Sequence, residues 1–166
     1  SNNTYKQDKG EKLYRRSLYT YWRRTIPPPT MLTFNAAERE VCIVRKDQTI
    51  TPLQALTLMN NVTFVESARH LAERIMTQED LTSEDERITY AFMAILSRPP
   101  SSRELALLKE DFLHHEEIFS KNPQAVGQLL KVGEKPNDSK LPSAVLAAYA
   151  LVASTILNLD EAISLN

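Results

Sequence analysis

Residues 141–159 read LPSAVLAAYALVASTILNL, a stretch with no charged residue in a chain in which 25% of residues are charged. Its length reaches that of a membrane span. Alanines and hydroxyl side chains fill much of it, however, and Tyr149 lies near its middle. A helix that is apolar all round is also typical of the centre of a helical bundle. Because small side chains let neighbouring helices approach on several sides, we predict that this segment is the buried core helix and not a membrane span.

Shorter helices with one apolar face are predicted to pack around this core helix. Thr51 suits an N-cap with Pro52 at the first helical position, and Leu53, Leu56 and Met59 are expected to form the apolar face of the helix that follows. Asn60-Asn61 is expected to end or bend it. Further helices are predicted over 62–78, 84–96, 102–120 and 123–130, with an exposed loop over 132–140. Residues 51–166 are therefore predicted to form a multi-helix bundle, and the fold class is mainly α.

A short N-terminal β-hairpin is expected ahead of the bundle, after a mobile polar lead-in over residues 1–12. In LYRRSLYTYWRR (13–24) aromatic and β-branched residues dominate a period-2 pattern, which predicts a strand. The alternation of residues 40–49 predicts its partner strand. The two would form one domain with the bundle.

Between the two expected strands lies a proline-rich segment that we expect to wrap on the bundle. Three consecutive prolines (27–29) exclude a strand because they lack N–H donors. Asn35 suits the N-cap of a single helical turn, with Glu38 three residues on.

The first fifty residues are basic, whereas the rest of the chain is acidic. Residues 1–50 hold ten Lys and Arg against five Asp and Glu, and residues 51–166 hold ten against sixteen. Arginine beside aromatic residues favours interfaces and ligand surfaces, but buried arginines paired with acids would equally fix the proline-rich segment as a scaffold. The candidate binding residues are Arg15, Arg16, Tyr19, Tyr21, Trp22, Arg23, Arg24, Arg39, Glu40 and Arg45.

No catalytic residue, metal ligand or cofactor is predicted within this chain. Cys42 is the only cysteine, which excludes an intramolecular disulfide and a cysteine-based zinc cluster, and its apolar surroundings favour a buried, inert thiol. His114-His115 with Asp111 is interpreted as a solvated helix face, and His70 as a surface residue. There is no Gly-rich phosphate loop and no GxSxG motif. A net charge of −1 gives no bulk attraction for nucleic acid.

The run RRSLYTYWRRTIPPPTMLTFNAAEREVCIVRKDQTITPLQALTLMNN (15–61) resembles the planctomycete-type domain of unknown function 1553. Two later segments, LSRPPSSREL (96–105) and LNLDE (157–161), resemble it too. Asn35 is a departure, since the family usually has Asp there. The resemblance implies the C-terminal part of that domain, within a periplasmic or cell-surface multidomain protein. It also implies that any haem belongs to a separate cytochrome c-like domain upstream.

Three functions are therefore compatible with the sequence. The leading hypothesis is a non-catalytic structural or interaction module, whose expected partners are upstream segments of the same polypeptide or a second copy in a homo-oligomer. The second is part of an enzyme active site that upstream segments complete, with Arg39, Glu40 and Cys42 as this chain's contribution. The third is a carbohydrate-binding surface built on Tyr19, Tyr21 and Trp22. The substrate or ligand is not specified by the sequence.

Overall fold

The computed structural model of the chain describes residues 8–22, 27–36, 44 and 49–164. By its internal contacts the chain divides into two compact units, Ser1–Asp47 and Gln48–Asn166. Throughout the described ranges, regular structure is helical, which confirms the mainly α fold class. The elements are the 3-10 helices η1 (Gly10–Tyr14) and η2 (Ser17–Tyr19) and the α-helices α1 (Pro29–Thr33), α2 (Pro52–Asn60), α3 (Val62–Thr77), α4 (Glu84–Leu96), α5 (Ser102–Lys121), α6 (Pro123–Leu130), α7 (Ser143–Leu157) and α8 (Asp160–Ile163).

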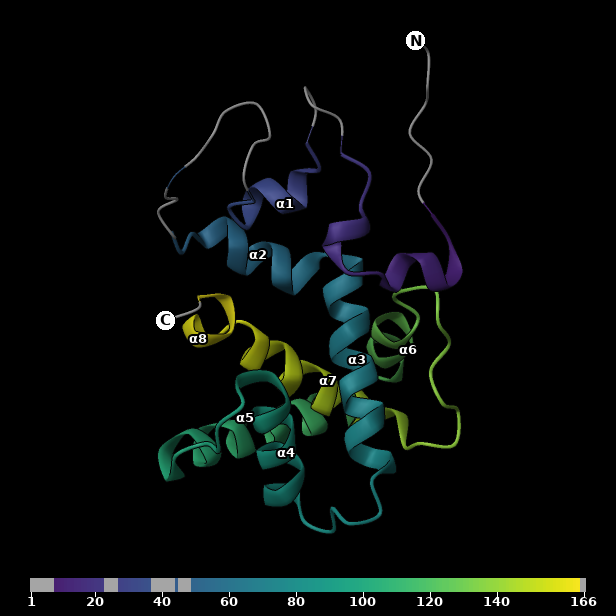
Figure 1. Cartoon of the computed structure of the whole chain (residues 1–166). Coiled ribbons are helices and arrows are strands. Elements are labelled where there is room, and N and C mark those ends of the chain that lie inside the picture. The colour runs from purple at the N-terminus through teal and green to yellow at the C-terminus, as the bar shows by residue number, and fades with distance from the viewer. Residues whose placement is uncertain (1–7, 23–26, 37–43, 45–48, 165–166) are drawn as a thin grey trace. The chain divides into compact units, whose positions relative to one another are not determined.

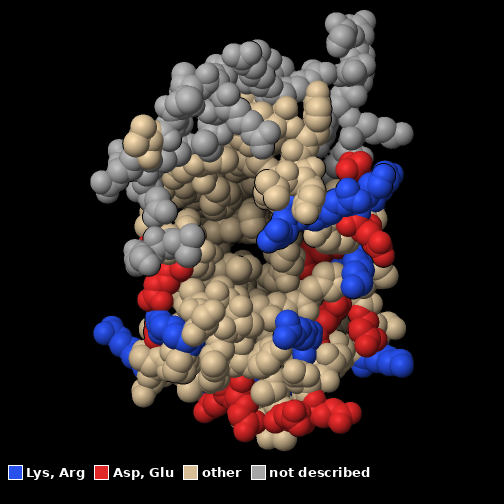
Figure 2. Space-filling model, in the orientation of Figure 1, with Lys and Arg blue, Asp and Glu red and all other residues tan. Residues whose placement is uncertain are grey.

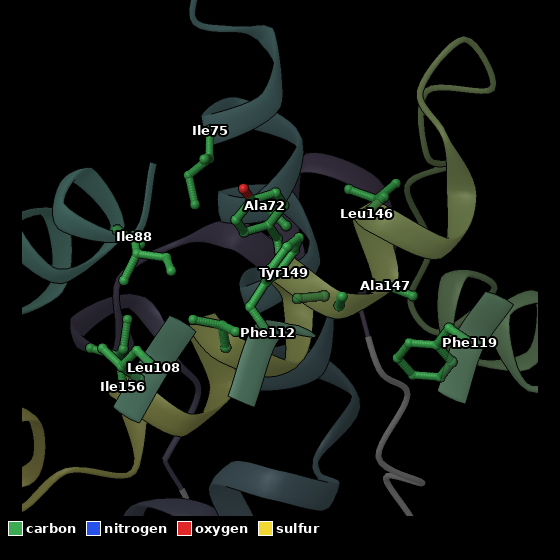
Figure 3. Packing of buried hydrophobic residues seen from close by; sticks show 14 of the residues in the cluster. Ala72, Ile75, Ile88, Leu108, Phe112, Phe119, Leu146, Ala147, Tyr149 and Ile156 are labelled. Carbon is green, nitrogen blue, oxygen red and sulfur yellow. The ribbon is translucent and has the colours of Figure 1, made fainter. Parts of the chain in front are cut away.

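Helix α7 is the core of the second unit, as predicted from its uncharged sequence. Helices α3, α4, α5 and α6 all pack against it (Figure 1). Its small residues Ala147, Ala148 and Ala153 are 0% exposed, so neighbouring helices reach its backbone closely. Figure 3 shows the Tyr149 ring beside Phe112, with ring centroids 4.3 Å apart. No helix in the described part of the chain is long and apolar enough to cross a membrane.

The helix starts follow from their capping residues. Thr51, Ser83 and Ser101 are N-caps: the side-chain oxygen of each accepts a hydrogen bond from the backbone N–H three residues on. The side chain at that later position accepts a hydrogen bond from the backbone N–H of the N-cap residue, which completes a capping box. At α4 this later side chain is Glu86. Its carboxylate accepts hydrogen bonds from the backbone N–H of Ser83 and from the hydroxyl and backbone N–H of Thr82. These hydrogen bonds lower the pKa of Glu86 to about 2. The predicted starts are thereby confirmed, because capping is a local property of the sequence.

The strand predicted over 13–24 is not formed where the structure describes this segment. Residues 10–14 and 17–19 are 3-10 helices instead, and Thr20 N–H donates to the Ser17 carbonyl at 3.1 Å. A single alternating segment gains ladder hydrogen bonds only beside a partner strand, and here short local bonds replace them. The partner strand predicted over 40–49 lies almost wholly outside the described residues.

Helix α1 follows directly on the prolines, where no helix was predicted. Pro29 occupies its first position, which suits a residue without an N–H. The helix ends at Thr33, and Asn35, two residues further on, has a left-handed φ of 57°. The N–H groups of Asn35 and Ala36 donate to the carbonyls of Leu32 and Met31 at 3.0 and 2.8 Å, the two bonds of a Schellman motif. Asn35 therefore closes the preceding helix, whereas the helical turn predicted to follow it lies almost wholly outside the described residues.

Candidate interaction surfaces

Half of the candidate binding residues lie in the described part of the first unit. Arg15, Arg16, Tyr19 and Tyr21 are exposed there, and Trp22 is half-buried. The side chains of Tyr19 and Tyr21 are 65% and 72% exposed. The remaining candidates, Arg23, Arg24, Arg39, Glu40 and Arg45, lie outside the described residues, as does Cys42.

The exposure of these residues follows from the short turns of the segment. Between η1 and η2 the backbone is extended at Arg15 and Arg16, so successive side chains point in different directions. Leu18 within η2 is 70% exposed and Tyr14 at the end of η1 is 49% exposed. Residues 14–21 thus expose aromatic rings, a leucine and two guanidinium groups to solvent. We call these residues the basic aromatic surface.

Helix α2 is oriented opposite to the prediction. Leu53, Leu56 and Met59, expected in the core, are 60%, 55% and 58% exposed. The residues that face the rest of the unit are Gln54 and Leu58, at 1% and 7% exposed. Gln54 turns inward to complete the capping box, with its Oε1 accepting from the Thr51 N–H at 2.9 Å, and Leu58 lies one turn further along the same face.

The sequence around this outward face contains no charged residue. Residues 48–65 contain no Asp, Glu, Lys or Arg, although these residues make up 25% of the chain. Two further apolar residues, Ile50 and Val62, flank α2 at its ends and are 55% and 57% exposed. We call Ile50, Leu53, Leu56, Met59 and Val62 the α2 stripe. It is the feature that sequence reasoning missed, because the spacing of apolar residues does not say which face of a helix is buried when both faces contain leucine.

The rest of the second unit presents a mixed surface. Figure 2 shows acidic and basic side chains interspersed over much of this unit, with acidic residues gathered at the end where α3 and α4 are joined. Glu84, Asp85 and Glu86 lie in the first turn of α4, where they complement the helix dipole. Asp85 also accepts from Lys109 Nζ of α5 at 2.7 Å.

A buried charge cluster on α3 is the strongest polar feature of the second unit. Glu66 and Arg69 are 4% and 1% exposed. Arg69 donates to Glu73 at 3.0 Å and to the Lys135 carbonyl. His70 Nδ1 lies 2.7 Å from Glu73 Oε2. His70 thus contacts this cluster and is still 25% exposed, so it lies at the edge of the cluster, on the polar side of α3.

The cluster holds the loop between α6 and α7. Glu66 Oε1 accepts the N–H groups of Glu134 and Lys135 at 3.1 and 2.8 Å. Gly133 begins this turn with a φ of 100°, and a Cβ there would lie 2.7 Å from Glu66 Oε1. This position therefore requires glycine for two reasons: its φ is positive, and a Cβ would clash with the Glu66 side chain. We call the Glu66–Arg69 cluster with this turn the loop clamp.

The arrangement of the loop clamp favours a structural role over an acid–base role. A general base must reach a proton on a substrate. The His70 Nε2 atom is buried and lies 3.9 Å from Glu66 Oε1, so it faces the clamp rather than solvent. Within the described residues no group of three or more His, Cys, Asp or Glu side chains has an arrangement that could hold a metal ion.

His115 of the α5 histidine pair belongs to a polar contact between helices. His115 Nε2 lies 3.1 Å from Asp111 Oδ1 one turn earlier, and the other carboxylate oxygen of Asp111 accepts from the Thr155 hydroxyl of α7 at 3.2 Å. The Asp111 carboxylate therefore links α5 to α7, and His115 extends this polar contact along the helix surface.

A second charge cluster joins the α4–α5 turn to α8. Arg98 donates to both carboxylate oxygens of Glu161, at 2.7 and 2.8 Å, and to both of Glu104, at 3.1 and 2.8 Å. Its guanidinium carbon lies 4.9 Å from the centroid of the Phe92 ring. The Arg98 side chain is the first cause that lowers the pKa of Glu104, to about 2, and it also lowers the pKa of Glu161. Segments 96–105 and 157–161 thus meet in one structural contact.

Comparison with known proteins identifies a family but no activity, ligand or partner. A model of the family described as "Protein of unknown function (DUF1553)" matches residues 1–112. That range includes the basic aromatic surface, the α2 stripe and the α3 part of the loop clamp. No curated protein and no solved structure matches the chain.

Proposed function

Because the chain belongs to this DUF1553 family, whose description assigns no activity, we propose that it is a non-catalytic structural or interaction module. The proposal includes its setting, a larger extracytoplasmic multidomain bacterial protein. The family resemblance supports that setting. Upstream segments of the same polypeptide are the proposed partner.

The observation that carries the proposal is the exposure of Arg15, Arg16, Tyr19 and Tyr21 on the basic aromatic surface. Arginine and tyrosine dominate the residues that contribute most to binding energy at protein interfaces. In contrast, the prominent charge clusters of the second unit serve the fold itself, since Arg69 and Arg98 each bind carboxylates of their own unit. A partner that offers carboxylates beside apolar groups fits the basic aromatic surface best.

Binding of the chain to the upstream part of its own polypeptide tests this proposal by titration calorimetry. We expect Arg15→Ala combined with Arg16→Ala to weaken binding at least tenfold, which corresponds to about 1.4 kcal/mol. Arg103→Ala is the matched control, because Arg103 is an exposed arginine on α5. Equal affinities of both variants, or no binding at all, would contradict the proposal.

Exposed tyrosines also support carbohydrate binding as a second candidate. Tyr19 and Tyr21 offer ring faces to solvent, and tyrosine combines an apolar ring with a polar hydroxyl. Titration with soluble cell-wall oligosaccharides would detect such binding. A heat signal that Tyr21→Ala abolishes would favour this candidate over the interaction module.

For the cofactor, we propose that the chain carries none and that any haem is bound upstream. This rests on the family resemblance and on the single cysteine, which excludes a CxxCH attachment motif. Absorption spectra of the purified full-length protein and of this isolated chain would show which of them binds haem. A Soret band in the spectrum of the isolated chain would contradict the proposal.

A further inference from the structure

We propose that the α2 stripe is a self-association surface, on which α2 of one copy packs antiparallel against α2 of a second copy. The inference rests on the outward face of α2 and is independent of the basic aromatic surface. Its starting point is the inverted burial of this helix. A polar residue, Gln54, is 1% exposed, whereas three large apolar residues of the same helix are at least 55% exposed.

The residues of the stripe are spaced symmetrically about Leu56. Leu53 and Met59 lie three positions on either side of it, and Ile50 and Val62 lie six positions on either side. In a two-fold pair of antiparallel helices whose axis passes near Leu56, Leu53 of each copy therefore faces Met59 of the other. Ile50 precedes the N-cap of α2 and Val62 begins α3, so these two residues flank the helix contact at its ends. Such self-complementarity is what an isologous interface requires.

Charge supports a second copy over other occupants. Residues 48–65 carry no charged side chain, so two copies of this segment meet without repulsion. A nucleic acid or an anionic surface would demand basic residues, and a peptide recognised by its charge would demand the opposite sign. An uncharged apolar face is complementary to another uncharged apolar face.

On α5, by contrast, exposed apolar residues lie among charges. Leu107 and Leu113 of α5 are 57% and 48% exposed, but Lys109 and Glu110 lie between them in sequence. Scattered single residues of this kind are normal on soluble proteins. The α2 stripe differs because five such residues follow one another at a spacing of three without an intervening charge.

The area of the stripe sets the expected strength. Burial of the exposed parts of five such side chains removes on the order of 300–500 Å² per copy from water. Stable complexes bury about 800 Å² per partner. We therefore expect a weak dimer in rapid exchange, with a dissociation constant of about 10 µM to 1 mM.

Cysteine cross-linking in the full chain tests both the surface and its direction. In a Cys42→Ala background, Leu56→Cys is expected to form a disulfide-linked dimer under mild oxidation. A mixture of Leu53→Cys and Met59→Cys chains is expected to cross-link faster than either chain alone, because the pair is antiparallel. Leu107→Cys on α5 is the matched control and is expected to cross-link at least tenfold more slowly.

Sedimentation equilibrium provides a second, independent readout. We expect the chain to dimerise reversibly, Leu56→Lys to raise the dissociation constant at least tenfold, and Leu107→Lys to leave it unchanged. The Arg15→Ala and Arg16→Ala changes should also leave it unchanged, which separates this inference from the proposed function. A monomer up to ~1 mM, at the weak limit of the expected range, would overturn the inference. So would preferential cross-linking of Leu53→Cys to itself, or a Leu56→Cys thiol that the rest of its own chain protects from reagent.

Discussion

Replacement of Glu66 by alanine removes the carboxylate at the centre of the loop clamp. Its Oε1 accepts two backbone N–H groups, from Glu134 and Lys135, and lies 3.8 Å from the buried Arg69 guanidinium. Hydrogen bonds to a charged group contribute about 1.5–3 kcal/mol each. The two N–H donors belong to exposed loop residues, so water compensates part of their loss, and we expect Glu66→Ala to lower the free energy of unfolding by about 3 kcal/mol.

Urea denaturation followed by circular dichroism measures this change directly. About 3 kcal/mol corresponds to a fall in Tm of about 6–12 °C for a chain of this size. Glu66→Gln keeps an acceptor oxygen but not the charge beside Arg69, so we expect roughly half the loss. Glu110→Ala, on the exposed surface of α5, is the matched control and is expected to change stability by less than about 0.5 kcal/mol.

Hydrogen exchange gives the site-specific readout that a general loss of packing would not. The amides of Glu134 and Lys135 should exchange faster in Glu66→Ala than in the control, under conditions where α7 remains protected. Glu66→Ala with the stability of the control and unchanged exchange at these two amides would refute the clamp as the element that holds the loop.

Three further changes test the fold and its electrostatics. Gly133→Ala should destabilise by about 2–3 kcal/mol in thermal melts, since its φ is 100°, whereas Gly127→Ala, with open space for a Cβ inside α6, should stabilise by up to about 1 kcal/mol; the reverse order would contradict both. Ala148→Asp places an unpaired carboxylate at a position 0% exposed and should abolish cooperative unfolding at 25 °C, so a soluble variant with an unchanged Tm would oppose the core assignment of α7. The pKa of Glu104 is lowered from 4.5 to about 2, so its contribution to stability is present above pH 4.5 and is lost as pH falls toward 2. Arg98→Met should reduce this loss of stability between pH 4.5 and 2. An unchanged loss in the variant would contradict the role of the Arg98–Glu104 contact.

Features encoded locally could be predicted from the sequence, and those that depend on distant partners could not. Thr51, Ser83 and Ser101 begin helices because each finds its capping partner three residues on. The central position of α7 could also be predicted locally. Its sequence is uncharged and rich in alanine, and such a segment has few stable environments other than the core of a helical bundle. The Arg98–Glu161 contact, by contrast, joins residues 63 positions apart, and no spacing rule reveals it.

The loop clamp and the orientation of α2 show where a better interpretation was available. Glu66, Arg69, His70 and Glu73 follow one another at helical spacing, a pattern that indicates one charged face. Such a face is usually solvated, and only the loop that folds over it makes it buried. On α2, the capping role of Gln54 indicated that this residue turns inward, but the three apolar residues of the opposite face outweighed it in the prediction.

Self-association through the α2 stripe requires above all that α2 turns an apolar face outward. Thiol labelling of Leu56→Cys and Leu58→Cys, each in the Cys42→Ala background and at a concentration of ~1 µM at which a weak dimer is dissociated, measures it directly. Leu56 is 55% exposed and Leu58 is 7% exposed, so we predict that Leu56→Cys reacts at the rate of a free thiol and Leu58→Cys at least tenfold more slowly. Fast labelling at Leu58→Cys with protection at Leu56→Cys would mean that α2 buries its apolar stripe, and would contradict the account.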